Sequence, residues 1–150
     1  MTTIVATRDR MVSDSKATIS SADLVYPATK IFRAKGMVVG ACGDNGDCTR
    51  FIEWAQGGFK GKPEFTFKKD DEEDSIIGLV LKEDGIYIFC PSYPAPEKVN
   101  AEFFAIGSGG SAALVAMHLG KTPEEAVELA CKVDELNSGL PLQVLKLEGK

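Results

Sequence analysis

Residues 75–90 read SIIGLVLKEDGIYIFC and contain the clearest pair of strands in the chain. Two apolar runs, 75–81 and 86–90, flank a turn at residues 83–85 that contains an Asp-Gly pair. Asp-Gly suits a type I′ turn, because both central residues of that turn take positive φ angles. We therefore expect an antiparallel β-hairpin in the middle of the chain.

Apolar runs of strand length also lie on both sides of this hairpin. The first two are separated by the polar residues Arg8 and Asp9, and the next two by Lys35 and Gly36, where glycine supplies the positive φ of a tight turn. Both pairs predict hairpins. The expected strands are TTIVAT (2–7), RMVSDSKATI (10–19), KIFRA (30–34), MVVGACG (37–43), FFAIG (103–107) and LPLQVLKL (140–147).

Three segments have the periodicity of helices. In the first, apolar side chains recur at i, i+3, i+4 and i+7 after the N-capping residues 44–45, and the glycines at 57–58 end the run. The second helix is expected over residues 109–119, and the third begins at a capping box in residues 122–125. The apolar stripes are Cys48, Phe51, Ile52 and Ala55 in the first helix and Ala126, Leu129, Ala130 and Val133 in the third.

The order of these elements favours an α+β fold. Strands come in runs and so do helices, whereas a parallel βαβ sheet would alternate them. The chain of 150 residues has the size of a single domain, 1–150, and can bury about 70% of the surface that its unfolded form exposes. We therefore expect one layered domain with a substantial core.

Composition and charge exclude several classes of function. The 17 basic and 22 acidic residues give a net charge of −5, which argues against a nucleic-acid partner, because such binding needs a basic surface. The longest apolar stretches, 76–81 and 112–117, are far shorter than the roughly 18 residues of a membrane span, so no membrane partner is expected. The opening MTTIVATRDR lacks the features of a secretory signal, and we expect a cytoplasmic protein.

No segment predicts a metal site. The acidic run at residues 70–74 is interpreted as a solvated loop, because five adjacent acids cannot all face one ion. His118, on an apolar helix, is expected to be a packed core histidine. The cysteines form no CxxC pair and have no histidine-rich partner segment, so buried free thiols are expected rather than zinc ligands or disulfides. The cysteines are Cys42, Cys48, Cys90 and Cys131.

Thr2, next to the opening methionine, is a candidate nucleophile. Methionine before a small residue is ordinarily trimmed, which would leave a threonine with a free α-amine beside its hydroxyl. Such an amine has an ordinary pKa of about 7.7 to 8.0, so near neutrality it can take the proton from Oγ1 as the hydroxyl attacks a carbonyl. On these two residues alone, an ordinary chain start is the better interpretation.

Five motifs taken together resemble the proteasome β-subunit and its bacterial relative, the HslV peptidase. They appear in the order and at spacings similar to those of that family, and the resemblance covers residues 2–58 and 75–147. It implies the N-terminal-nucleophile (Ntn) hydrolase fold, a four-layer αββα sandwich in which the first strand delivers the nucleophile to a cleft between two sheets. The motifs are TTIVATR, SDSKAT, TKIFR, VVGACGD and FFAIGSGG.

The resemblance also implies a set of catalytic residues. Thr2 matches the nucleophile, and Asp14 and Lys30 match the acid and the lysine that stand beside it. A lysine kept charged by a carboxylate would lower the pKa of the neighbouring amine and hydroxyl. Gly43 matches the glycine whose backbone N–H forms the oxyanion hole, with a slip towards Gly40 left open.

Further residues complete this implied site. Ser108 matches a serine whose hydroxyl supports the terminal amine; the alternative, an anion-binding loop, lacks the GKS or GKT ending of a phosphate loop. Glu135 and Ser138 match an acid and a serine three residues apart. A first specificity pocket with a preference for small or apolar side chains is also implied. The residues at its positions are Ala17, Phe32 and Ala41.

One helical layer departs from the family pattern. The family has two long helices between its first strands and its middle hairpin, whereas here only the helix at residues 45–56 is evident. That layer contributes to subunit packing in family rings. Ring size and the docking of an unfoldase therefore stay open.

We interpret the chain as a threonine-type endopeptidase that forms an acyl-enzyme on Thr2, without a cofactor or metal. The resemblance implies peptide or unfolded-protein substrates, a self-compartmentalising homo-oligomer and an ATP-dependent unfoldase as partner. Two alternatives are a catalytically silent scaffold or ring subunit and an Ntn amidase for a small amide. A scaffold has no need of Thr2, Asp14 and Lys30 together.

Overall fold

Two antiparallel sheets and a separate two-stranded ribbon form the β-structure. The computed structural model describes residues 1–22, 24–66 and 73–148. The five-stranded sheet has the order β5-β6-β7-β8-β9, the four-stranded sheet has the order β10-β1-β2-β11, and β3 pairs with β4 alone. The strands are β1 (Ile4–Thr7), β2 (Arg10–Ser13), β3 (Lys16–Ile19), β4 (Leu24–Pro27), β5 (Ile31–Ala34), β6 (Met37–Gly43), β7 (Ile76–Lys82), β8 (Gly85–Phe89), β9 (Glu97–Val99), β10 (Phe103–Ile106) and β11 (Gln143–Lys146).

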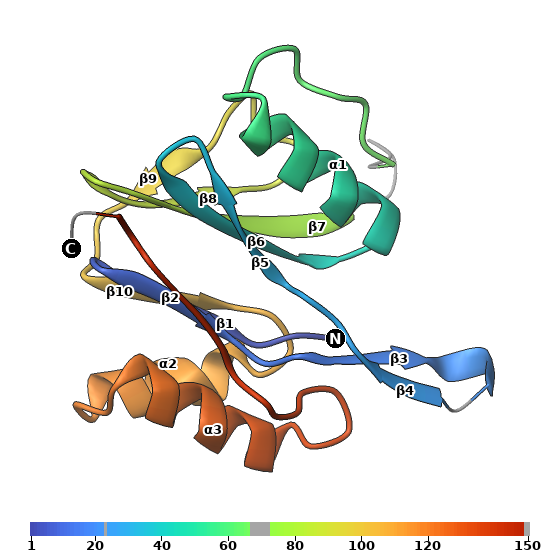
Figure 1. The fold of residues 1–150 in the computed structure, drawn as a ribbon, viewed down its shortest axis with the longest axis vertical. Helices are drawn as coiled ribbons and strands as arrows, with labels where there is room; N and C mark the ends of the chain where they lie inside the picture. Colours follow the sequence, from blue (N-terminus) through green and yellow to red (C-terminus); the bar gives the residue numbers. More distant parts are fainter. Residues whose placement is uncertain (23, 67–72, 149–150) are drawn as a thin grey trace.

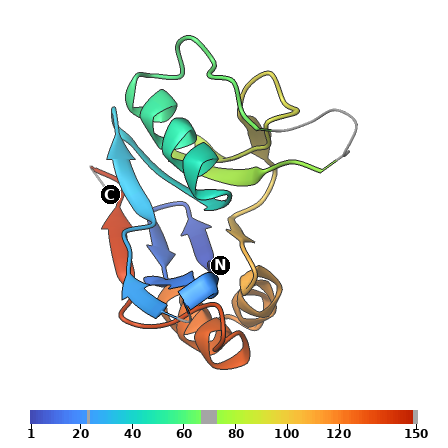
Figure 2. The same cartoon turned by 90° about the vertical axis from the view of Figure 1, so that its right-hand side faces the viewer.

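The two sheets face each other, and helices cover their outer sides (Figure 1). Helix α1 (Asn45–Gln56) lies on the five-stranded sheet, and α2 (Gly110–His118) and α3 (Pro123–Val133) lie side by side on the four-stranded sheet. The same order of levels is visible in the turned view (Figure 2). The α+β class expected from the sequence is confirmed in this arrangement.

An apolar core fills the space between the sheets. Ile4 and Met11 of the four-stranded sheet pack with Leu79 and Ile86 of the five-stranded sheet, and all four side chains are completely buried. At about 25 cal/mol per Å² of apolar surface, each buried aliphatic side chain stabilises the fold by about 1.5 to 3 kcal/mol. The hairpin of β7 and β8 is the one predicted from residues 75–90, and it supplies the centre of its sheet.

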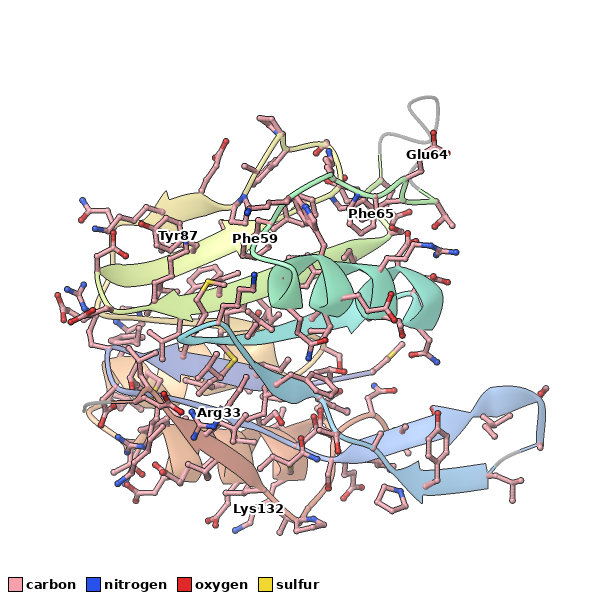
Figure 3. The ribbon with its side chains drawn as sticks, turned by 45° about the horizontal axis from the view of Figure 1, so that its top comes forward. Arg33, Phe59, Glu64, Phe65, Tyr87 and Lys132 are labelled. Carbon is pink, nitrogen blue, oxygen red and sulfur yellow. The ribbon has the colours of Figure 1, made fainter. Side chains whose placement is uncertain are left out.

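An aromatic cluster joins α1 to the outer face of the five-stranded sheet. Phe51 stacks on Phe89 with ring centroids 5.4 Å apart, and Trp54 meets the same ring edge-on at 5.1 Å. Phe59 and Phe65, labelled in Figure 3, follow α1 and contact Trp54. Among the described residues between β6 and β7, α1 is the one helix, as the shortened layer in the sequence indicates.

Helix α3 begins as expected but buries a different face. Thr122 and Glu125 form the predicted capping box, with Pro123 in the first turn. The helix packs against both the four-stranded sheet and α2, which rotates its buried stripe away from the predicted one. The prediction was wrong for Leu129 and Val133, which are exposed. The buried side chains are Ala126, Val127, Ala130 and Cys131, besides the proline.

Several other expectations change. His118 is exposed at the end of α2 and meets the Phe103 ring edge-on, so the prediction of a core histidine was wrong. The run at 10–19 is two strands, because it breaks at Asp14, whose side chain accepts backbone N–H groups. Strands β4 and β9 were not predicted.

The acidic run was expected to be a solvated loop, and its residues 70–72 lie outside the described residues.

The remaining expectations concern cysteines and membranes. All four cysteines are free, but only Cys131 is buried, and the other three are half-buried. None of the helices in the described part of the chain is both long enough and apolar enough to cross a bilayer.

Candidate active site

The chain opens directly into the centre of the four-stranded sheet. Because β1 lies between β10 and β2, Thr2 and Thr3 emerge beside the ends of both neighbours. Thr2 is 7% exposed, and its backbone N–H donates to Ser108 Oγ at 3.3 Å. Gly107, just before Ser108, has φ +99°, and a side chain there would collide with the Thr2 carbonyl. Glycine is thus required for the two segments to approach so closely.

Asp14 and Lys30 form an ion pair next to this N-terminal segment. Lys30 Nζ lies 3.0 Å from both carboxylate oxygens of Asp14. The Lys30 side chain is 8% exposed and the Asp14 side chain 0%. The same ammonium donates to the Met1 carbonyl at 2.7 Å. The cation therefore lies against the peptide that joins Met1 to Thr2.

Burial of Lys30 disfavours its charged form. Burial lowers its pKa from the ordinary lysine value, and the charge and hydrogen bonds of Asp14 oppose this shift only in part. Asp14 is held in place from other directions, because it accepts backbone N–H bonds from Thr3, Lys16 and Gly139 at 2.9 to 3.1 Å. The carboxylate thus fixes both the lysine and the backbone that follows Thr2.

A second hydrogen-bonded network supports the backbone N–H of Thr2. Ser108 Oγ donates to Asp134 Oδ2 at 2.6 Å, and Ser138 Oγ donates to the same oxygen at 2.9 Å. Ser138 also shares a 2.8 Å hydrogen bond with the buried Thr3 hydroxyl. The network therefore links the first residues of the chain to the turn after α3.

The acid in this network is Asp134 and not Glu135. Glu135 is exposed, and only its backbone carbonyl is engaged, by Lys16 Nζ at 2.7 Å. The sequence prediction of Glu135 is corrected, because Asp134 is the C-cap of α3 and its side chain turns back towards the sheet. The carboxylate of the network therefore lies one position earlier in the chain than predicted.

Asp134 is held as a carboxylate. Burial by itself would raise its pKa, but hydrogen bonds from Ser108, Asn137 and Ser138 outweigh burial, so the pKa lies below the ordinary aspartate value. An ionised Asp134 accepts from both serine hydroxyls. Ser108 Oγ can then direct a lone pair to the N–H of Thr2.

Gly43 lies at the end of β6, on the rim of a cleft. Its φ is +122°, and a Cβ there would collide with the Ser75 carbonyl, which itself accepts the N–H of Asp44 at 2.9 Å. Gly40 instead packs beneath the sheet, where a Cβ would touch the Ile4 side chain. Of the two glycines considered from the sequence, Gly43 is the one beside the cleft.

The cleft has a volume of about 640 Å³ and opens in front of Thr2. Its wall is formed by α1, the β3–β4 ribbon and the ends of β5 and β6. All three residues predicted for the specificity pocket line it, together with Thr2, Lys30 and Gly43. The pocket residues are Ala17, Phe32 and Ala41.

Cysteines and acids offer no alternative chemistry here. Cys42 and Cys48 line the cleft, but burial raises the pKa of both thiols, that of Cys48 to about 12, so neither is a thiolate near neutrality. Within residues 1–22, 24–66 and 73–148, no three His, Cys, Asp or Glu side chains gather as metal ligands would.

Two facing sheets, with an N-terminal strand that begins beside a cleft, define the Ntn hydrolase fold of the HslV type. Solved structures share it over nearly the whole of both chains. Eukaryotic HslV from Trypanosoma brucei is 21% identical with a TM-score of 0.68, covering 96% of this chain and 99% of that one. The BPH protein of Thiobacillus denitrificans is 20% identical with a TM-score of 0.68, covering 99% of each chain.

The same BPH protein in complex with epoxomicin gives a TM-score of 0.65 at 18% identity, covering 98% of each chain. No family model matches the sequence, and no curated protein matches it. At these identities the likeness establishes the fold, and the catalytic assignment depends on the residues described above.

Proposed function

We propose that the protein is a threonine-type endopeptidase with Thr2 as its N-terminal nucleophile. The observation that carries this proposal is the pair of contacts on either side of one peptide bond. Lys30 Nζ holds the Met1 carbonyl, and Ser108 Oγ accepts the Thr2 N–H. Once the bond between Met1 and Thr2 is cut, the same groups would surround a free amine and the threonine hydroxyl.

The mechanism follows from the chemistry of these groups. The neutral Thr2 amine takes the Oγ1 proton as Oγ1 attacks a substrate carbonyl, and the Lys30 charge favours the deprotonated forms. The Gly43 N–H would stabilise the oxyanion. The amine then returns its proton to the leaving amine, which departs and leaves an ester on Thr2. Water hydrolyses the ester, so the cycle needs no cofactor.

The layer arrangement and the specificity pocket are also part of the proposal. We regard the layers as the four-layer αββα sandwich of Ntn hydrolases, with the α1 layer reduced. The cleft walls contributed by Ala17, Phe32 and Ala41 favour a small or apolar substrate side chain beside the scissile bond.

Assembly and partners are further parts of the proposal. An exposed peptidase would attack cellular protein, so we expect a cytoplasmic homo-oligomer built from copies of one interface, which encloses its cleavage sites. Folded substrates would need an ATP-dependent unfoldase, whereas short peptides would not. Light scattering at micromolar concentration tests this, and a stable monomer that cleaves peptides would favour the small-amide alternative.

The direct test of function is covalent labelling. Epoxomicin, the ligand of the structurally similar BPH protein, is incubated with chains that begin at Thr2, and intact mass is measured. One adduct per chain is expected, with none on Thr2→Ala. Unlabelled chains that begin at Thr2 and are folded would contradict the proposal and support a silent subunit.

A further inference from the structure

Lys30 lies in a segment that belongs to no sheet. Residues 28–30 connect β4 to β5 without strand structure of their own. The Ala28 N–H donates to the Ser15 carbonyl at 2.8 Å, which anchors the start of the segment. The backbone at Lys30 is anchored by a side chain instead.

That side chain is Gln143, the first residue of β11. Its Oε1 accepts the Lys30 N–H at 2.9 Å, and its Nε2 donates to the Ala28 carbonyl at 2.7 Å. Its Oε1 also accepts from Ser13 Oγ at 3.2 Å. Gln143 and Ser13 are register partners, so the glutamine projects from the pair of strands that carries Asp14 at its end.

An amide is well suited to this position. It has one acceptor and one donor group in a plane, and here both bind the two backbone groups of the lysine segment as a neighbouring strand would. Within the described residues, the side-chain hydrogen bond between β5 itself and β11 runs from Arg33 Nη1 to the Lys146 carbonyl at 2.8 Å, and Arg33 is labelled in Figure 3.

We propose that Gln143 is a positioning residue, which sets the backbone of Lys30 and thereby the place of its ammonium between Asp14 and the N-terminus. The inference rests on the proposed function of Lys30, since it specifies what holds that lysine. Gln143 does not line the cleft. Its contribution therefore acts on the chemical step and leaves substrate binding to the cleft.

The test compares Gln143→Met with Arg33→Gln, which removes the side-chain hydrogen bond between β5 and β11. Both variants begin at Thr2 and are assayed with a fluorogenic peptide. A misplacement of about 1 Å costs up to 100-fold in rate. We expect kcat of Gln143→Met to fall about 10- to 100-fold with KM within about twofold, and Arg33→Gln to keep both constants. Unchanged kcat in Gln143→Met would overturn the proposal.

A second variant, Gln143→Glu, tests the proposal if Gln143→Met does not fold. Gln143→Glu keeps the acceptor for the Lys30 N–H and loses the donor to the Ala28 carbonyl, so a smaller loss of kcat is expected. Wild-type kcat in this variant and in any folded Gln143→Met would again overturn the role of Gln143.

Amide hydrogen exchange separates this inference from the proposed function. The Lys30 N–H should exchange at least about tenfold faster in Gln143→Met than in wild type and Arg33→Gln, because methionine removes its acceptor. This readout needs no activity. An inactive wild type would contradict the peptidase assignment, whereas unchanged exchange at Lys30 would contradict the positioning role.

Discussion

Lys30 Nζ lies 3.0 Å from both oxygens of Asp14, a carboxylate with no exposed surface. A buried charge without a partner is strongly destabilising, but Asp14 also accepts three backbone N–H bonds. Removal of the lysine therefore leaves the carboxylate hydrogen-bonded. We therefore expect the chain to stay folded when the pair is broken.

We expect Lys30→Ala to lower kcat on the order of 100-fold or more, as loss of one preorganised electrostatic group does. The variant should remain folded by circular dichroism, because of the backbone bonds to Asp14. Peptide turnover measured from pH 6 to 9 checks the prediction. An unchanged rate and pH profile would show that Lys30 is an ordinary polar residue.

Removal of Met1 should be required for activity. With Met1 in place the Thr2 nitrogen belongs to an amide, which cannot accept the Oγ1 proton at neutral pH. Intact mass of active and inactive fractions checks this, and the active fraction should lack the methionine. A fully active preparation that retains Met1 would exclude the proposed general base.

Asp134 and Glu135 are adjacent acids that give a matched pair of variants. Asp134→Asn should lower kcat about 10- to 100-fold, because Ser108 and Ser138 lose their shared charged acceptor. Glu135→Gln should stay within about twofold of wild type, since the Glu135 side chain is exposed and only its backbone carbonyl is bonded. Equal losses in both variants would contradict the structural assignment.

Asp47 makes stability depend on acid pH. Burial would raise its pKa, but hydrogen bonds from Ser75, Thr66 and Arg50 outweigh burial and lower it. A lowered native pKa gives stability that is present above the unfolded value of about 3.9 and is lost as pH falls through the native pKa. Thermal unfolding from pH 7 to 2.5 should show a shallower acid loss for Asp47→Asn.

The control for this measurement is Glu128→Gln, which changes an exposed carboxylate on α3. Its unfolding temperature should follow that of wild type through the acid range. If Asp47→Asn also follows wild type, the hydrogen bonds to Asp47 do not favour its charged form.

Gly43→Ala and Gly36→Ala compare two glycines with positive φ. At Gly36, φ is +79° and nothing lies within 4 Å of an added Cβ, so a cost of about 1 kcal/mol is expected. At Gly43 a Cβ also meets the Ser75 carbonyl, so a larger loss of stability and of turnover is expected. Urea unfolding and peptide hydrolysis, measured on both variants, distinguish the two sites.

The strands and helices could largely be predicted because their local signals agree with their packing. The β7–β8 hairpin and the capping box of α3 are examples. The expected type I′ turn of that hairpin was wrong, because its two central residues, Glu83 and Asp84, do not have positive φ. Strand β4 could not be predicted, because all four of its residues are exposed and its sequence shows no alternation. The buried face of α3 depends on the position of α2, which no pattern within α3 contains.

Some residues of the candidate site could also be predicted from the sequence, and others could not. Asp14 and Lys30 lie next to strands whose register is fixed by a buried face, so their motifs predicted them correctly as neighbours. The acid after α3 was misplaced by one residue, because the direction of a side chain after a helix depends on the backbone angles of the cap. Gln143 gave no signal, since a single polar residue at a strand start has many uses.

The central position of β1 has a consequence for biosynthesis. Thr2 is synthesised early, yet β10, one of the two sheet neighbours of β1, and the groups that support Thr2 and Lys30 lie at residues 103–108 and 134–143. Pairing between such distant parts of a chain forms slowly. Lys30 is therefore not fixed by Gln143, and Ser108 and Ser138 are not bonded to Asp134, until almost the entire polypeptide has been made. Translation itself would keep the nucleophile unassembled while other nascent proteins are close by.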